Sequence, residues 1–229
     1  FIAAGIVAGD RVAGFMPNMP ETLICALAAT SIGAIWSSAS PDFGVQGVVD
    51  RFGQIEPKIL VSVDGYFYNG KVMDVTAKLV DILPKISSVQ KTILVPFASD
   101  TPDISSVPKG VLLSDFIAPY TAQDPKFTRL PFNHPLFIMF SSGTTGIPKC
   151  IVHGHGGTLI QHMKEHMLQC DIHEGDKVFY FTTCGWMMWN WQVSALASGA
   201  TLMMFDGSPF YPDPYALWDY TSKHGCMLF

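Results

Sequence analysis

Charged residues are scarce in this 229-residue sequence, making up 14% of it against 48% hydrophobic residues, and the net charge is −5. No run of basic residues occurs, so the sequence lacks the positive patch that binding to nucleic acid or to an anionic membrane surface requires. Polar residues or glycine interrupt every apolar stretch well before the roughly 18 residues that a membrane-spanning helix needs. The composition predicts a soluble globular chain with a sizeable core.

The five cysteines form no Cys-x-x-Cys pair, which argues against a zinc site or a dithiol motif. They are scattered along the chain, most of them among apolar neighbours: Cys25, Cys150, Cys170, Cys184 and Cys226. This distribution predicts buried free thiols in a reducing compartment rather than a disulfide framework. We therefore expect a cytosolic location.

Two histidines, His162 and His166, lie four residues apart on a predicted helix, a spacing that can chelate zinc. Met163 follows the first histidine where the zinc-protease motif has glutamate, and no third ligand is spaced near the pair. We predict no metal site made by these side chains.

The segment at 140–149 reads Phe-Ser-Ser-Gly-Thr-Thr-Gly-Ile-Pro-Lys. It offers free backbone amides, four hydroxyl groups and one cation, Lys149, which are the groups that surround a polyphosphate. It is not the common P-loop, because Pro148 precedes the lysine and Cys150 follows it. Proline fixes its own φ and has no amide hydrogen, so we predict that the chain returns as a strand and forms a hairpin-like phosphate grip.

A flexible surface linker is the alternative interpretation of this hydroxyl-rich and glycine-rich composition. The segment is, however, flanked by Leu-Phe-Ile-Met-Phe at 136–140 and by Ile-Val at 151–152, which are typical of core strands. These flanks favour a phosphate-binding loop.

A second unusual stretch, at 184–191, reads Cys-Gly-Trp-Met-Met-Trp-Asn-Trp. Such adaptable side chains line apolar ligand pockets, and a packed core helix is the alternative for most of them. Gly185, Trp186 and Met187 fall where a predicted strand gives way to a helix, at the end where open α/β sheets bind ligands. We predict that these three residues face a ligand.

Strands and helices alternate through most of the chain. Strands are predicted near residues 11–16, 34–37, 59–63, 92–95, 178–182 and 200–205, and helices near 21–32, 42–55, 72–83, 156–169, 187–197 and 215–224. A loop is predicted at 66–70. This order predicts an α/β fold with mainly parallel, doubly wound sheets and flanking helices. Between 97 and 134 the pattern lapses, either as a linker or, as loop length favours, as a lateral excursion of one large domain.

The segment at 141–149 resembles the signature loop of the AMP-forming (adenylate-forming) synthetase superfamily. Ser-Pro-Asp-Phe-Gly at 40–44 and Gly-Trp-Met-Met-Trp-Asn-Trp at 185–191 resemble its acetyl- and acetoacetyl-CoA synthetase branch. The resemblance implies a two-step ligase, in which a short, possibly β-keto, carboxylate and MgATP give an acyl-adenylate and pyrophosphate. Coenzyme A then takes the acyl group. ATP, Mg²⁺, coenzyme A and the acid are thus the implied small-molecule ligands.

The resemblance also assigns roles to residues. The groups implied to hold the ATP phosphates are Ser141, Ser142, Gly143, Thr144, Thr145, Gly146 and Lys149. Lys149 and Thr144 are implied to act in catalysis, and Gly185, Trp186 and Met187 to enclose the acyl group.

By the same resemblance, residues 1–229 correspond to part of the large N-terminal AMP-binding domain. The family's later nucleotide, magnesium and ribose stretches, and its small C-terminal domain with the adenylation lysine, have no counterpart in the sequence. We expect this chain alone to be inactive. The alternative is a catalytically silent truncated product that binds only nucleotide or a partner.

Overall fold

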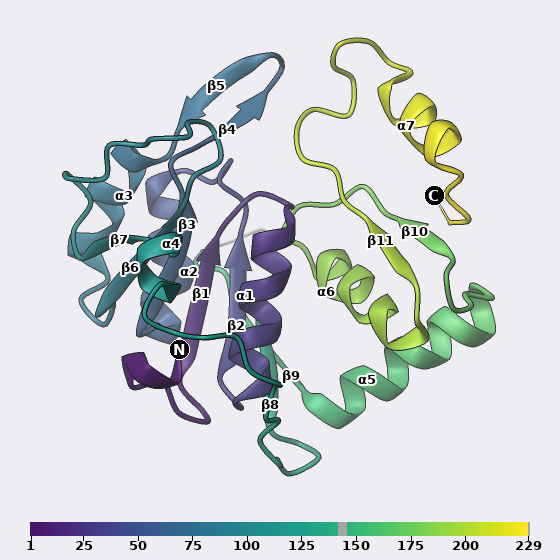
Figure 1. The fold of residues 1–229 in the computed structure, drawn as a ribbon, viewed down its shortest axis with the longest axis horizontal. Coiled ribbons are helices and arrows are strands. Elements are labelled where there is room, and N and C mark those ends of the chain that lie inside the picture. The colour runs from purple at the N-terminus through teal and green to yellow at the C-terminus, as the bar shows by residue number, and fades with distance from the viewer. Residues whose placement is uncertain (142–145, 229) are drawn as a thin grey trace.

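A seven-stranded sheet with the order β7-β6-β3-β1-β2-β8-β9 forms the centre of the computed structural model, which describes residues 1–141 and 146–228 (Figure 1). All neighbouring strands pair in parallel except β9, which runs antiparallel to β8. In spatial order the strands are β7 (Gly110–Leu112), β6 (Lys91–Val95), β3 (Ile59–Val63), β1 (Arg11–Phe15), β2 (Ile35–Ala39), β8 (Pro135–Phe140) and β9 (Cys150–Gly154). The predicted α/β fold with a mainly parallel sheet is confirmed.

Helices cover both faces of this sheet. The chain leaves β1 through α1 (Pro20–Ser31) to reach β2, and then returns across β1 through α2 (Val45–Ile55) to reach β3. Because crossovers are right-handed, these opposite directions put α1 on one face and α2 on the other, where α2 contacts α3 (Thr76–Ile82). The chain therefore continues to one face of the sheet after β1 and to the other face after its neighbour β2. Open α/β sheets have a crevice at the carboxyl ends of two such strands.

A smaller unit follows the central sheet in sequence and lies beside it (Figure 1). Its strands β10 (Lys177–Phe179) and β11 (Thr201–Met203) pair in parallel around a small core of Ile172, Val178 and Ala195. Its helices are α5 (His155–Lys164), continued by a π-helical turn (Glu165–Gln169), α6 (Met187–Ser194) and α7 (Ala216–His224). Among the described helices, none has the length and apolarity needed to cross a bilayer.

The prediction of a loop at 66–70 is wrong, and the helix predicted from residue 72 begins later. The chain forms an antiparallel hairpin of β4 (Gly65–Tyr68) and β5 (Lys71–Asp74), and α3 begins only at Thr76. Asn69 and Gly70 make the turn with φ values of 49° and 72°. Positive φ at both central residues is the requirement of the tight hairpin turn that Asn-Gly favours.

The proline-rich segment at 97–134 contributes to the main sheet. It supplies the edge strand β7, which pairs with β6, and the short helix α4 (Leu113–Ile117). Val111 and Phe116 pack against the main core. Three short 3₁₀ helices complete the described elements: Ile2–Ala4, Leu83–Lys85 and Ala195–Ser198.

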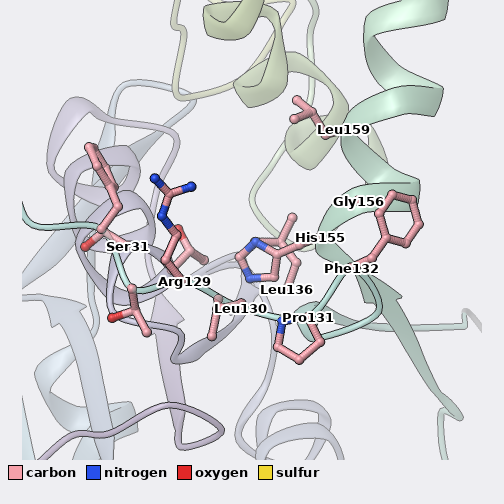
Figure 2. A pocket seen from close by; sticks show the side chains of 12 residues that line it. Ser31, Arg129, Leu130, Pro131, Phe132, Leu136, His155, Gly156 and Leu159 are labelled. Atoms are coloured by element: carbon pink, nitrogen blue, oxygen red, sulfur yellow. The ribbon is translucent and has the colours of Figure 1, made fainter.

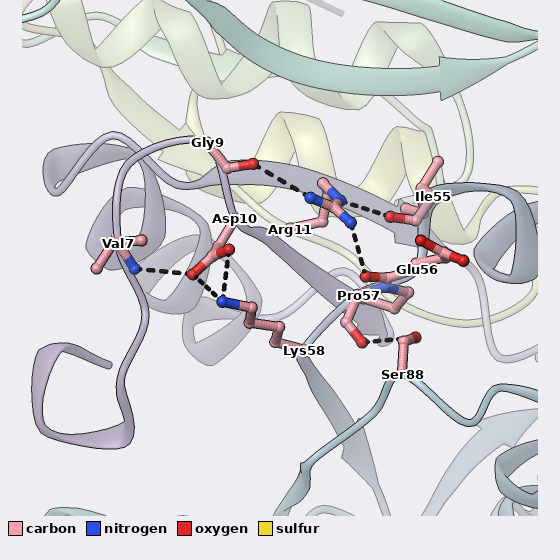
Figure 3. A network of polar contacts seen from close by, with 9 residues as sticks. All are labelled: Val7, Gly9, Asp10, Arg11, Ile55, Glu56, Pro57, Lys58 and Ser88. Carbon is pink, nitrogen blue, oxygen red and sulfur yellow. Dashed lines mark hydrogen bonds and ion pairs between the residues drawn. The ribbon is translucent and has the colours of Figure 1, made fainter.

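A polar network ties β1 to α2 and β3 (Figure 3). Lys58 donates to the Asp10 carboxylate at 2.8 Å, while the Arg11 guanidinium donates to the carbonyls of Ile55, the last residue of α2, and of Glu56. Because the last carbonyls of a helix have no partner within it, Arg11 satisfies groups that would otherwise need water.

Two of the cysteines, Cys25 and Cys184, are buried as predicted, whereas the prediction is wrong for the exposed Cys150.

The close contact between Gly14 and Trp36 at the centre of the sheet predicts how a substitution there affects stability. Trp36 on β2 is fully buried, and a Cβ added at Gly14 on β1 would lie 2.6 Å from Trp36 Cζ2. We expect Gly14→Ala to lower the free energy of unfolding by about 1 to 3 kcal/mol, because a bulky buried ring must move. Gly53→Ala on α2 is the matched control, since nothing lies within 4 Å of its added Cβ, and it should stabilise by about 0.5 to 1 kcal/mol. Urea unfolding midpoints of equal value for the two variants would contradict this packing.

Candidate active site

The predicted phosphate loop spans a β-hairpin. β8 and β9 pair antiparallel, with Phe140 opposite Cys150 at the end of the ladder. Beyond that pair, the Ser141 amide donates to the Lys149 carbonyl at 3.0 Å, and the Lys149 amide donates to Ser141 Oγ at 3.1 Å. The prediction that the chain returns as a strand is confirmed, and the loop is closed at its base by Ser141 and Lys149.

Part of the predicted loop lies outside the described residues, namely Ser142, Gly143, Thr144 and Thr145. Of the rest, Gly146 has a φ of 90°, which glycine adopts readily. Lys149 is exposed, and within the described part of the chain no hydrogen bond or ion pair is formed by its ammonium group. Lys149 thus places a positive charge at the exposed base of the hairpin.

The second predicted element, the turn of Gly185, Trp186 and Met187, lies between β10 and α6 and packs against the carboxyl end of β2. The Cys184 carbonyl accepts a hydrogen bond from Ser38 Oγ at 2.7 Å. A Cβ added at Gly185 would lie 3.0 Å from Phe43 Cζ and close to the Ser40 amide, so a larger residue here would press against the Phe43 ring.

Trp186 and Met187 are well exposed, at 58% and 45%, whereas Trp189 and Trp191 are buried. The sequence left open whether this stretch lines a ligand pocket or forms a packed core helix. Its first residues face outward, as a pocket lining requires, and its later tryptophans are packed in the core. Trp189 Nε1 donates to Asn18 Oδ1 at 2.9 Å, which fixes α6 against the loop that follows β1.

The two predicted elements meet through β8 and β9. A small cavity is lined both by Met139, two residues before Ser141, and by Gly185 and Trp186. A second cavity, of about 500 Å³, is lined by His153 of β9 and by Met187 and Met188 of α6. The structure thus brings the hairpin and the tryptophan turn to one edge of the sheet.

His162 and His166 join α5 and its π-helical extension to α6. His162 Nδ1 lies 2.8 Å from Ser194 Oγ, and His166 Nε2 lies 2.9 Å from the Trp191 carbonyl. Burial, and next the neighbouring His166, lower the pKa of His162 to about 4, so it is neutral near pH 7. Within the described residues, no group of three or more His, Cys, Asp or Glu side chains could hold a metal ion.

An acidic cluster that the sequence did not indicate lies at the same edge. Asp206, in the loop after β11, accepts a hydrogen bond from the Asn18 amide at 3.1 Å. Burial is the largest influence on Asp206 and, with the charge of Asp42, raises its pKa to about 6. Burial and then Asp42 likewise raise the pKa of Tyr66 to about 12.

Another cavity, of about 810 Å³, lies at the opposite end of β8 (Figure 2). Its lining includes Arg129, Phe132, Leu136 and His155, and none of the predicted site residues that the structure describes. Size alone therefore does not identify the site, since the predicted residues gather at the other end of the strand.

A family model described as "AMP-binding enzyme" matches residues 1–229. The chain is 57% identical over 228 residues to acetoacetyl-coenzyme A synthetase of Rhizobium meliloti (strain 1021), covering 99% of this chain and 35% of the relative. It is 54% identical over 229 residues to acetoacetyl-CoA synthetase of Mus musculus, covering 98% and 34%.

A solved structure, acetoacetyl-CoA synthetase from Streptomyces lividans, matches with a TM-score of 0.91 and 38% sequence identity. The match covers 98% of this chain and 34% of that one. The chain thus spans about a third of the length of the relatives that it matches.

The raised pKa of Asp206 predicts a pH-dependent cost to stability. The folded state holds this proton more tightly than the unfolded state, whose carboxyl titrates near 3.8, so stability falls as pH rises from about 4 to about 6. Asp206→Asn removes the ionisation and keeps an oxygen for the Asn18 amide. We expect a gain of about 1 to 3 kcal/mol in unfolding free energy at pH 7.5 and little gain at pH 4. Asp124→Asn, which removes an exposed carboxylate, is the charge-matched control. Equal gains at both pH values would contradict the assignment.

Proposed function

Because this chain belongs to the AMP-binding enzyme family, we propose that the intact protein is an AMP-forming acid–thiol ligase. Its reaction converts acetoacetate, ATP and coenzyme A into acetoacetyl-CoA, AMP and pyrophosphate. The names of the relatives support acetoacetate as the acid, since the likeness to them extends over almost the whole chain. These residues form part of the large AMP-binding domain of that protein, and its location is the cytosol.

One observation in the structure carries the proposal: the closed base of the β8–β9 hairpin holds Lys149, whose ammonium has no partner among the described residues, at the same edge as the tryptophan turn. Ser141 and Lys149 exchange two hydrogen bonds there, and Met139 shares a cavity wall with Gly185 and Trp186. A nucleotide phosphate site and an acyl site must be adjacent for the two substrates to react, because the reacting atoms must approach within about 3 to 3.5 Å. This arrangement supports a site for both substrates.

In the first step, a carboxylate oxygen of the acid attacks the α-phosphorus of ATP. The bond from that phosphorus to the bridging oxygen breaks, and pyrophosphate leaves with the added negative charge. Lys149 neutralises this charge, and the hydroxyls and amides from Ser141 to Gly146 hold the phosphate oxygens. Thr144 and Thr145 supply hydroxyl donors in this assignment. A positive group held in place before the reaction stabilises the developing charge without reorganising at the transition state.

In the second step, the sulfur of coenzyme A attacks the acyl carbon, the acyl–phosphate bond breaks and AMP leaves. Gly185 lets the turn pack closely against Phe43 and Ser40, while the exposed Trp186 and Met187 supply apolar walls for the acyl group. Mg²⁺, when bound, neutralises phosphate charge.

Pyrophosphate release by the intact protein tests the function directly. Acetate, propionate, butyrate and acetoacetate should be supplied in turn with MgATP, and acetoacetate should give the highest kcat/KM. No release with any acid, by a protein that still binds ATP, would favour the alternative of a silent nucleotide-binding product.

Removing the charge of Lys149 should slow the first step. We expect Lys149→Ala in the intact protein to lower ATP–pyrophosphate exchange by ten- to a thousand-fold, which is about 1.4 to 4 kcal/mol. Lys126→Ala, which removes an exposed lysine from the 97–134 segment, is the control and should keep the wild-type rate. Wild-type exchange in the Lys149 variant would remove this residue from the site.

Trp186→Ala should change the choice of acid more than the KM for ATP. The exposed indole would fill space beside a small acyl group, and each methylene of pocket volume is worth roughly 1 to 3 kcal/mol of discrimination. The ratio of kcat/KM for butyrate to that for acetoacetate should therefore rise at least several-fold, with Trp186→Phe in between. An unchanged ratio together with a large increase in the KM for ATP would assign Trp186 to the nucleotide side.

A further inference from the structure

Helix α2 presents two polar side chains, Arg51 and Gln54, to the base of the phosphate hairpin. The opposite side of the helix is firmly held, because Val48, Phe52 and Ile55 are buried in the main core. A helix packed in this way is a rigid platform, and rigid elements support functional groups more accurately than loops do.

Gln54 contacts the chain on both sides of Lys149. Its Nε2 donates to the Pro148 carbonyl at 2.8 Å, and the Cys150 thiol lies 3.7 Å from its Oε1, in position to donate. The same Nε2 also donates to the Asp50 carbonyl within α2 at 2.6 Å, which holds the amide in place. The residues immediately before and after Lys149 are thus both attached to α2.

Arg51, one helical turn earlier, reaches both halves of the candidate site. Its guanidinium carbon lies 5.9 Å from the centre of the Phe140 ring, at the end of β8, and 4.6 Å from that of Phe43. Both distances suit a cation–π contact. Phe43 in turn is the ring against which Gly185 packs, so α2 contacts the phosphate hairpin and the neighbour of the acyl turn.

We propose that Gln54 is a positioning residue for Lys149. This inference rests on the proposed function. Gln54 holds the 148–150 segment against α2. The backbone of Lys149 is thereby kept in one position, from which its ammonium contacts the leaving pyrophosphate. Lys149 and Cys150 are exposed, and among the described residues the segment is otherwise attached by the two hydrogen bonds to Ser141 and by the pairing of Cys150 with Phe140. A displacement of about 1 Å at a reacting group can cost up to a hundred-fold in rate, so a moderate loosening has a measurable effect.

The test is ATP–pyrophosphate exchange by the intact protein. Gln54→Ala should lower kcat three- to ten-fold with little change in the KM for acetoacetate, since the acyl turn is not touched. Gln54→Glu keeps the size of the side chain and replaces the donor to Pro148 with a carboxylate oxygen, so it should be at least as slow. Gln46→Ala is the matched control: Gln46 lies on the same helix, is exposed, and donates within α2 to Asp50 Oδ1. It should retain the wild-type rate.

A double-mutant cycle separates positioning of Lys149 from general loosening. If Gln54 acts through Lys149, the Gln54→Ala/Lys149→Ala protein should be no slower than Lys149→Ala alone, and thermal melts of Gln54→Ala and Gln46→Ala should agree within a few degrees. Independent, multiplying losses in the cycle, or a wild-type rate for Gln54→Ala, would overturn the proposal. If Lys149→Ala itself exchanges at the wild-type rate, or if the wild-type protein shows no exchange, the proposed function fails first, and that result is distinguishable from a failure at Gln54.

Discussion

The position of the candidate site depends on the attachment of β8 to β2. The register of that parallel pair contains Trp36 opposite Phe137, and a buried hydrogen bond from Ser37 Oγ to the Ile138 carbonyl at 2.7 Å reinforces it. Leaving such a buried carbonyl without a donor costs on the order of 1 to 3 kcal/mol. Because β8 leads directly into the predicted phosphate loop, this attachment determines where the chain leaves the sheet at Ser141.

Once β8 is in place, the topology of the sheet determines which other segments lie at the same end as the loop. Parallel strands share their carboxyl ends, so the segments after β1, β2 and β8, which contain Asn18, Ser40 and Ser141, emerge at one edge of the sheet although they are far apart in sequence. The smaller unit then attaches to that edge through contacts of Trp189 and Asp206 with Asn18. The tryptophan turn is thus carried by a different layer from the β8–β9 hairpin, and the two layers meet at the end of the sheet.

The sequence was informative wherever local pattern decides structure. The apolar flanks at 136–140 and 151–152 predicted the hairpin, and alternating elements predicted the sheet. The β4–β5 hairpin was missed although Asn69-Gly70 is a strong turn signal, because the residues after it also suit a helix, which does form from Thr76. Asp206 and Gln54 could not have been found in this way, since their significance comes from hydrogen bonds that span 188 and 94 residues.

The hydrogen bonds of Arg11 to the end of α2 have a mechanical consequence (Figure 3). They fasten α2 to the central strand, so two separate routes lead from β1 to the segment around Lys149: one through β2 and β8, the other through Arg11, α2 and Gln54. A segment attached along two such routes is harder to displace than one attached along a single route. The base of the hairpin cannot slide along the sheet unless both connections yield, so any displacement of the segment around Lys149 must break contacts along both routes.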